Sequence, residues 1–402
     1  MKSRRSSLAI LFIIVFIDLL GFGMVMPLMA RYARELGAPV QYIGGVFALY
    51  SLMQFIFAPL WGRLSDRIGR RPVLLVSIFM TAVAFLATGL ARSFLVLLLT
   101  RAFAGAATAN IAIAQAYVAD VTAPEERAKG MGLIGAGFGL GFVLGPPVGG
   151  ILAELHLGAP FFGAALLSLV NGIAAFSILP EPERREATEH GAAPDRRIRE
   201  VLAALRRPEF GKLLTYYFLV ILAFSGMEAT FTLLAADRYG LSDRQVGLVF
   251  GFIGVIMVVV QGGLVGRLSR QLGEVKLLAG GAALMVLGLA ALPYAGGMGR
   301  LLAACVPLAI GQGLAQPSVA SLISRYARSQ AQGGSLGIGQ SAAAMGRIVG
   351  PFVGGYVFKF SPLYTYLGGA LVMAAAAVLA TTVREPRAAV AAERPEIEKT
   401  AS

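Results

Sequence analysis

The 402-residue sequence has few of the residues from which enzymes build reactive or metal-binding sites. It contains one cysteine, Cys305, and two histidines, which excludes a disulfide framework and a cysteine-based metal site and leaves little for histidine-based metal chemistry. Charged residues make up only 14% of the chain, whereas soluble domains usually carry about 25%. No nucleophile–base constellation and no phosphate-binding loop is present, so we expect neither an enzyme nor a bound cofactor or metal.

Hydrophobic residues make up 57% of the chain, and the formal net charge is +13. A nucleic-acid-binding protein with this charge would gather its basic residues on polar segments. Here the basic residues lie in short gaps between long apolar runs, which is typical of a polytopic membrane protein. The lipid bilayer is therefore the expected partner, and nucleic acid is not.

Twelve apolar runs are long enough to cross a bilayer as helices, because a hydrocarbon core of roughly 30 Å needs about 20 helical residues. The sequence thus predicts an all-α membrane protein with twelve transmembrane helices. The first run is too long for a signal-peptide core and lacks a clear cleavage site. The predicted spans are 8–30, 42–62, 73–91, 94–118, 130–153, 160–180, 210–236, 245–266, 275–295, 300–323, 332–358 and 362–383.

The distribution of lysine and arginine predicts the orientation of these helices. With the N-terminus inside, most basic residues fall in the loops on the inner side, including seven arginines between the sixth and seventh spans. We therefore expect both termini in the cytoplasm and the protein in the inner (plasma) membrane.

Two motifs recur at nearly the same spacing along the chain. Gly62-Arg-Leu-Ser returns at Gly266, 204 residues later, and Gly145-Pro-Pro-Val-Gly-Gly returns as Gly350-Pro-Phe-Val-Gly-Gly, 205 residues later. This agreement predicts two six-helix bundles in parallel repeat.

The predicted boundaries of the repeat are 1–180 for the first bundle and 210–384 for the second, joined by a cytoplasmic linker, 181–209, and followed by a tail, 385–402. The linker contains the segment 196–207, whose apolar residues recur with helical periodicity, so that a helix here would have one apolar face and one basic face. It is either an amphipathic helix on the inner leaflet or a solvated segment whose positive charge holds the topology.

Only four ionisable side chains lie well inside the predicted spans: Asp18, Arg101, Glu228 and Arg347. A charge at mid-membrane costs a few kcal/mol, so each needs a partner, a wet cavity or a change of protonation. Asp18 is either a proton-coupling group or a structural partner of Arg101 or of backbone. Glu228 is at the corresponding place in the second half. It carries a proton, binds a cationic substrate, or lies near the end of its helix in contact with water. We expect Arg347 to anchor its helix to a polar neighbour.

Polar and aromatic residues within the spans predict a cavity between the helices. An amide that faces lipid is costly, so these side chains should point inward, although hydrogen bonding between helices explains them nearly as well as substrate contact does. A mainly apolar cavity suits small amphipathic compounds. The residues are Tyr50, Gln54, Asn110, Gln115, Phe231, Gln261, Gln312 and Gln340.

Glycine and proline are concentrated in the 130–153 and 332–358 spans. Small residues on one stripe let helices approach closely, and proline bends a helix. This pattern indicates either a pliable seam between the halves or simple tight packing. The residues are Gly141, Gly145, Pro146, Gly149, Gly350 and Pro351.

Several motifs resemble those of the major facilitator superfamily. Gly62-x-x-x-Asp66-x-x-Gly69-Arg-Arg-Pro72 is similar to its signature loop, and Arg101-x-x-x-Gly105 and Gly141-x-x-x-Gly145-Pro are similar to further signatures of its proton-coupled antiporters. The segments 18–27 and 48–59 resemble twelve-helix drug exporters, especially tetracycline exporters.

The resemblance implies a monomer that exports small amphipathic compounds in exchange for protons by alternating access. It also links Arg101 to proton transfer, and a fixed cation can tune a neighbouring carboxylate, so we expect Asp18, Arg101 and Glu228 to couple transport to protons. A metabolite exporter, a proton symporter and a non-transporting receptor or assembly factor remain alternatives. Tetracycline exporters carry a histidine and an acid in the eighth and ninth helices, but neither 245–266 nor 275–295 has one between its ends, so the proton path or the substrate must differ.

The resemblance further implies a cytoplasmic gate that holds the inner side closed when the protein faces outward. Its residues are Gly62, Asp66, Gly69, Arg70, Arg71 and Asp120. The alternative is that the charges only enforce topology. In the second copy Arg270 stands where Asp66 would align, so we expect the charged cluster mainly in the first half.

Asp66→Asn tests the gate. We expect it to weaken the outward-facing state while folding and substrate contacts stay largely intact, because only the gating charge is lost. Labelling of cysteines introduced on the inner side measures the distribution of conformations, and an unchanged distribution would contradict the assignment.

Overall fold

The computed structural model describes residues 2–122, 127–182, 208–326 and 332–385. The segment 196–207, for which an amphipathic helix is one interpretation, lies outside the described residues, as does nearly all of the tail. Every regular element in the described ranges is helical.

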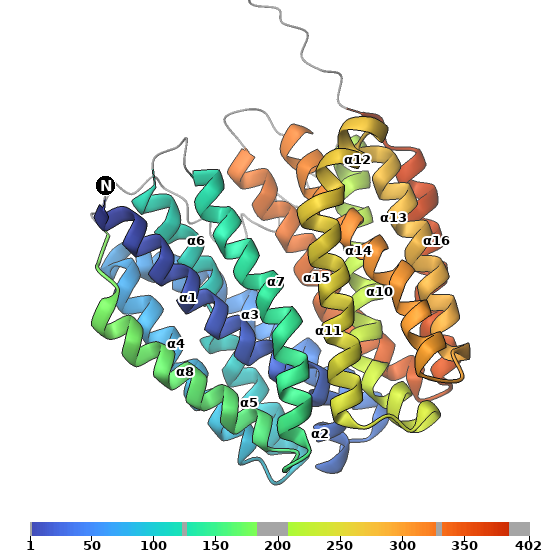
Figure 1. The fold of residues 1–402 in the computed structure, drawn as a ribbon, viewed down its shortest axis with the longest axis horizontal. Helices are drawn as coiled ribbons and strands as arrows, with labels where there is room; N and C mark the ends of the chain where they lie inside the picture. Colours follow the sequence, from blue (N-terminus) through green and yellow to red (C-terminus); the bar gives the residue numbers. More distant parts are fainter. Residues whose placement is uncertain (1, 123–126, 183–207, 327–331, 386–402) are drawn as a thin grey trace, which may run out of the picture.

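The first half of the chain forms the helices on the left of Figure 1, together with α2 at the bottom. In chain order they are α1 (Lys2–Val25), the 3₁₀ turn η1 (Met26–Leu28), α2 (Met29–Glu35), α3 (Val40–Ile68), α4 (Arg70–Gly89), α5 (Phe94–Ala107), α6 (Asn110–Val121), α7 (Arg127–Ala153) and α8 (Ala159–Ile178).

The second half forms the helices on the right of Figure 1. They are α10 (Pro208–Tyr239), α11 (Asp243–Val259), the π-helical turn η2 (Val260–Leu264), α12 (Val265–Leu272), α13 (Glu274–Ala291), the 3₁₀ turn η3 (Leu292–Tyr294), α14 (Met298–Tyr326), α15 (Gln332–Phe358) and α16 (Pro362–Thr381).

These helices have the length and composition needed to cross a membrane. Eleven spans in the described residues meet both criteria, and α15 is a twelfth long helix in the position predicted for a span. Large apolar side chains on their outer faces are exposed, for example Leu371 (72%), Val378 (67%) and Leu95 (66%). Such exposure is unfavourable in water and expected against lipid, so the chain is a multi-pass membrane protein.

Three of the predicted continuous spans are interrupted. Pro27 lies in the 3₁₀ turn that separates α1 from α2, α5 ends before Thr108 and α6 begins at Asn110, and α11 continues through a π-helical turn that contains Gln261. Proline removes a backbone donor, which accounts for the first break. At the second break the Ser77 hydroxyl donates to the Ala107 carbonyl (2.6 Å) and accepts from the Ala109 N–H (3.0 Å), so a side chain of α4 stabilises the backbone there.

Two turns at the same end of the molecule depend on glycine. Gly69 separates α3 from α4 with φ of +111°, and Gly273 separates α12 from α13 with φ of +83°. Side chains with a Cβ rarely adopt these angles. The two glycines are 204 residues apart, the same spacing as Gly62 and Gly266. We call this end of the molecule the basic end.

Glycine stripes join helices within each half. On α7, a Cβ added at Gly141, Gly145 or Gly149 would lie 2.7 Å or less from an atom of α1. On α15, a Cβ at Gly350 would lie 2.4 Å from the Leu222 carbonyl oxygen of α10. Each half therefore has one helix pair in backbone contact, α1 with α7 and α10 with α15.

The other faces of α7 and α15 make the contacts between the halves. A Cβ at Gly44 of α3 would lie 1.8 Å from the Pro351 carbonyl oxygen, and one at Gly247 of α11 would lie 2.3 Å from the Pro146 carbonyl oxygen. Both contacts lie away from the basic end. Toward the basic end the same helices leave Leu60, Leu64 and Leu264 exposed, and the two groups of helices lie apart there in Figure 1. The halves thus meet at the end opposite the basic end.

Gly44→Ala is expected to move the protein away from this conformation. The added methyl group overlaps backbone of α15, and overpacking of this kind costs about 1–3 kcal/mol, which shifts a conformational equilibrium by about fivefold or more. Spin labels at exposed Leu155 and Lys359, placed in a Cys305→Ser background, measure the separation of the halves, which we expect to widen. Gly45→Ala is the matched control because a Cβ there meets nothing within 4 Å; equal behaviour of the two variants would contradict this account.

Candidate functional site

Asp18 lies in the middle of α1, and its side chain is buried, with 6% exposed. The amide nitrogen of Asn110 donates to its Oδ1 at 2.7 Å. Asn110 is the first residue of α6, so the break between α5 and α6 brings this amide to the carboxyl group. The structure thereby joins two residues that the sequence assigned to different roles.

Arg101 is a second buried polar group, with 5% exposed, and lies on α5. Its Nη2 donates to the Thr88 hydroxyl at 2.8 Å, and its guanidinium carbon lies 5.9 Å from the centre of the Tyr50 ring. Its Nε has no hydrogen-bond partner among the described residues. Within the described residues no ion pair shorter than 4.0 Å joins Arg101 to Asp18, so the direct pairing that was one alternative for Asp18 is absent in this conformation.

A small cavity connects these two groups. It has a volume of about 20 Å³ and is lined by Asp18, Arg101, Tyr50, Thr108 and neighbouring apolar side chains. A space of this size holds about one water molecule. The carboxyl group and the guanidinium group therefore face one another across a site that a single water could bridge.

Tyr50 also connects this site to the second half. Its hydroxyl interacts electrostatically with Arg101 and Asp18 of the first half and also with Arg347 of α15. Arg347 interacts in turn with Glu228 and Tyr217 of α10. The four intramembrane charges of the sequence thus lie around one polar centre, with two in each half.

The other predicted cavity residues fall into three groups by exposure. Tyr50 and Gln54 are half-buried, and Gln115, Gln261 and Gln340 are exposed. Gln312 is buried on α14 (2% exposed), and its Oε1 has no partner among the described residues. Phe231 departs from the prediction: it is 1% exposed and packs edge-on against Phe250 at 5.2 Å, so it belongs to the apolar core instead of a cavity wall.

At the basic end the structure assembles the charges of the predicted gate. Arg70 pairs with Asp66 at 2.5 Å and with Asp120 at 2.8 Å, and it donates to the Ser65 hydroxyl at 2.7 Å. These residues come from α3, α4 and α6, so the cluster joins helices of the first half only in this conformation. Gly62 has no atom within 4 Å of an added Cβ, so this glycine makes no close helix contact in this conformation.

Glu181 is a member of this cluster that sequence reasoning missed. Its carboxylate accepts the backbone N–H groups of Arg70 (2.7 Å) and Arg71 (3.1 Å), so it satisfies the free donors at the start of α4. A Cβ at Gly69 would lie 2.6 Å from Glu181 Oε1, so the turn needs glycine for space as well as for its φ angle. The available signal was Glu181-Pro182, which returns 204 residues later as Glu385-Pro386.

The second half has an equivalent cluster with its charges exchanged. Glu274, the first residue of α13, pairs with Arg325 near the end of α14 at 3.0 Å and accepts a hydrogen bond from the Ser321 hydroxyl. In the first half the signs are reversed: Arg70 is the first residue of α4, and Asp120 lies near the end of α6. The first-half cluster remains the larger of the two, with two ion pairs at Arg70, but alignment on Asp66 alone did not predict the ion pair of Glu274 in the second half.

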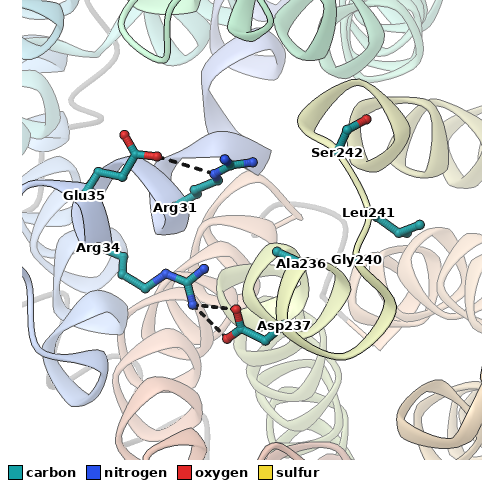
Figure 2. Close-up of a pocket in the computed structure, with 8 residues that line it drawn as sticks. All are labelled: Arg31, Arg34, Glu35, Ala236, Asp237, Gly240, Leu241 and Ser242. Carbon is teal, nitrogen blue, oxygen red and sulfur yellow. Dashed lines mark hydrogen bonds and ion pairs between the residues drawn. The ribbon is translucent and has the colours of Figure 1, made fainter.

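Ion pairs bridge the two halves at the opposite end. Arg31 pairs with Asp243 at 2.9 Å, and Arg34 pairs with Asp237 at 2.7 Å. Figure 2 shows the second of these pairs across a recess of about 500 Å³ between α2 and the end of α10. The sequence had shown these arginines only as positive charges of an outer loop, without their partners.

Membrane-spanning helices around a polar centre, closed at one end by contacts between two similar halves, define a membrane transporter. Comparison with known proteins identifies the family. A model of the Major Facilitator Superfamily matches residues 11–342 and, in a second match, 264–402. The chain belongs to this superfamily, whose members are transporters.

Relatives and solved structures agree with this membership. The chain is 30% identical to tetracycline resistance protein class C of Escherichia coli over 356 residues, 88% of this chain and 89% of that protein. It is 26% identical to multidrug resistance protein 2 of Bacillus subtilis over 381 residues, 92% and 94% of the two chains. The crystal structure of the human organic anion transporter MFSD10 superposes with a TM-score of 0.71 at 26% identity and covers 94% of this chain and 99% of that one.

Substitutions at the bridging ion pairs are expected to have graded effects. Asp243 is 10% exposed in its side chain and Asp237 is 49% exposed, and an ion pair is worth more where water is excluded. We expect Asp243→Asn to weaken closure of this end by about 1–3 kcal/mol and Asp237→Asn by less than about 1 kcal/mol. The distance between spin labels at positions 155 and 359 measures the effect of each substitution. A larger effect of Asp237→Asn would contradict the assignment.

Proposed function

We propose that this protein exports small amphipathic compounds, including drugs, across the inner membrane in exchange for protons. The observation that carries the proposal is the buried Asp18 carboxyl group, which has one hydrogen-bond partner among the described residues and lines, with Arg101, a cavity large enough for about one water molecule. A carboxyl group in this setting can take up or release a proton as the cavity gains or loses contact with water. The names of the tetracycline and multidrug resistance relatives support efflux.

The proposed cycle assigns each part of the structure a step. With the halves apart at the basic end, a compound enters from the cytoplasm and contacts half-buried Tyr50 and Gln54 near the polar centre. Rocking of the halves about α7 and α15 closes the basic end and opens the other, where Asp18 exchanges its proton. Arg101 favours the ionised form of Asp18 when the two approach, and Glu228 serves as a second proton-accepting group in the second half.

The orientation within the membrane follows from charge. The basic end carries most of the lysine and arginine residues, and such residues accumulate on the cytoplasmic side. We infer that the basic end and both termini face the cytoplasm and that the cluster around Arg70 steadies the first half there. The glycine contacts between α1 and α7 and between α10 and α15 hold each half rigid, so a single chain contains both moving parts and functions as a monomer.

Asp18→Asn tests the coupling. Asparagine keeps the shape and can still accept the hydrogen bond from Asn110, but it cannot release a proton. In liposomes with an internal pH indicator, we expect ethidium or tetracycline to release protons through the wild-type protein and this movement to fall at least about tenfold in the variant, while binding of the compound persists. Glu154→Gln, which removes an exposed carboxyl group 3.9 Å from Arg244, is the control and should behave as wild type.

Two outcomes would contradict the proposal. Undiminished proton movement in Asp18→Asn would remove Asp18 from the coupling path. Proton movement in the same direction as the compound would show a symporter. A growth and accumulation screen across drug classes in an efflux-deficient bacterium identifies the compounds to use.

A further inference from the structure

Arg347 is placed at the junction of the two halves by the contacts on either side of it. Gly346, the preceding residue, packs against Ile221 of α10, and its carbonyl oxygen accepts a hydrogen bond from the Ser225 hydroxyl at 3.1 Å. Pro351, one helical turn beyond Arg347 and on the same face, touches Gly44 of α3. Arg347 therefore lies between a helix of its own half and a helix of the other.

Glu228 approaches the same place from α10. It lies three residues beyond Ser225 and hence on the same side of the helix, and its carboxyl group interacts electrostatically with Arg347. Both side chains are partly exposed. Among the ion pairs within 4.0 Å in the described residues, none includes either group. A cation and an anion thus lie near enough to interact electrostatically but do not form a close ion pair.

Such an arrangement differs from that of the charged clusters at the two ends of the molecule. Arg70, Glu274 and Arg31 each have a partner of opposite charge at 3.0 Å or less. A guanidinium group held inside a membrane protein without a close carboxylate lacks the interaction that repays its dehydration. A ligand that supplies one charge of each sign would give both Arg347 and Glu228 a close partner at once.

We propose that Arg347 and Glu228 are specificity-determining residues that bind a zwitterionic amphipathic substrate. Arg347 receives its carboxylate or enolate through paired N–H donors, and Glu228 receives its ammonium group. Tyr50 and Tyr217, which both interact with Arg347, provide aromatic surface for the apolar body of the molecule. This assignment rests on the proposed function, because it names the class of compound exported, and it gives Arg347 a binding role in place of the anchoring role expected from sequence.

The test uses one scaffold in three charge forms. Ciprofloxacin is zwitterionic near neutral pH, its methyl ester is a cation, and its N-acetyl derivative is an anion. Binding to the purified full-length protein is followed by the fluorescence of the quinolone. We expect the zwitterion to bind at least about tenfold more tightly than either derivative, since each loses one charge-assisted contact.

Variants assign each contact to its residue. Arg347→Gln is expected to remove the preference for ciprofloxacin over its ester, and Glu228→Gln the preference over the N-acetyl form. Arg347→Lys should restore part of the first preference, and Arg238→Gln, at an exposed position of α10, should leave both unchanged. No binding of ciprofloxacin, equal affinities for the three forms, or a uniform loss in Arg347→Gln would overturn the inference.

The two proposals can fail separately. If ethidium drives protons across liposomes but the three quinolone forms bind alike, only the zwitterion assignment fails. If the quinolone preferences follow Arg347 and Glu228 but no compound moves protons, the binding assignment holds and the exchange mechanism is wrong. The comparison of the three quinolone forms needs only wild-type protein, so it is informative even if a variant does not fold.

Discussion

Backbone contact between helices, which only glycine permits, is the constraint on which the rest of this structure depends. The stripes on α7 and α15 bring these helices against α1 and α10, and Gly44 and Gly247 then bring the two halves together at Pro351 and Pro146. In lipid no hydrophobic effect draws helices together, so close packing of this kind supplies much of the attraction. Because the intimate contacts between the halves lie at one end, the helices at the other end are free to separate.

The polar centre follows from this packing. Each half contributes one acid and one arginine, Asp18 with Arg101 and Glu228 with Arg347, and Tyr50 interacts electrostatically with members of both sets. Within the first half the groups are held by neutral partners, Asn110 and Thr88. Neutral partners leave the charges available to interact with a proton, a water molecule or a substrate, whereas the clusters at both ends of the molecule neutralise their charges within the protein.

Much of this could be predicted from the sequence. Hydropathy predicted the twelve spans, and the 204- and 205-residue repeats pointed to the paired roles of α7 and α15. The breaks at Thr108 and at Gln261 could not be predicted, because they depend on tertiary hydrogen bonds such as that of Ser77 and on local helix geometry. Aromatic residues were equally ambiguous: Phe231 has the same sequence signature whether it lines a cavity or packs in the core. The bridging ion pairs were missed because charge counts carry no information about partners.

The exchanged charges at the basic end have a consequence for how a duplicated chain assembles. Two halves with the same helix order could pair each helix with the wrong copy of its neighbour. If α4 docked beside α14, Arg70 would meet Arg325, and if α13 docked beside α6, Glu274 would meet Asp120; like charges in contact oppose both arrangements. With α4 and α6, or α13 and α14, the charges are complementary. The reversal of polarity therefore marks each half, so that helices emerging one after another into the membrane recognise neighbours of their own bundle.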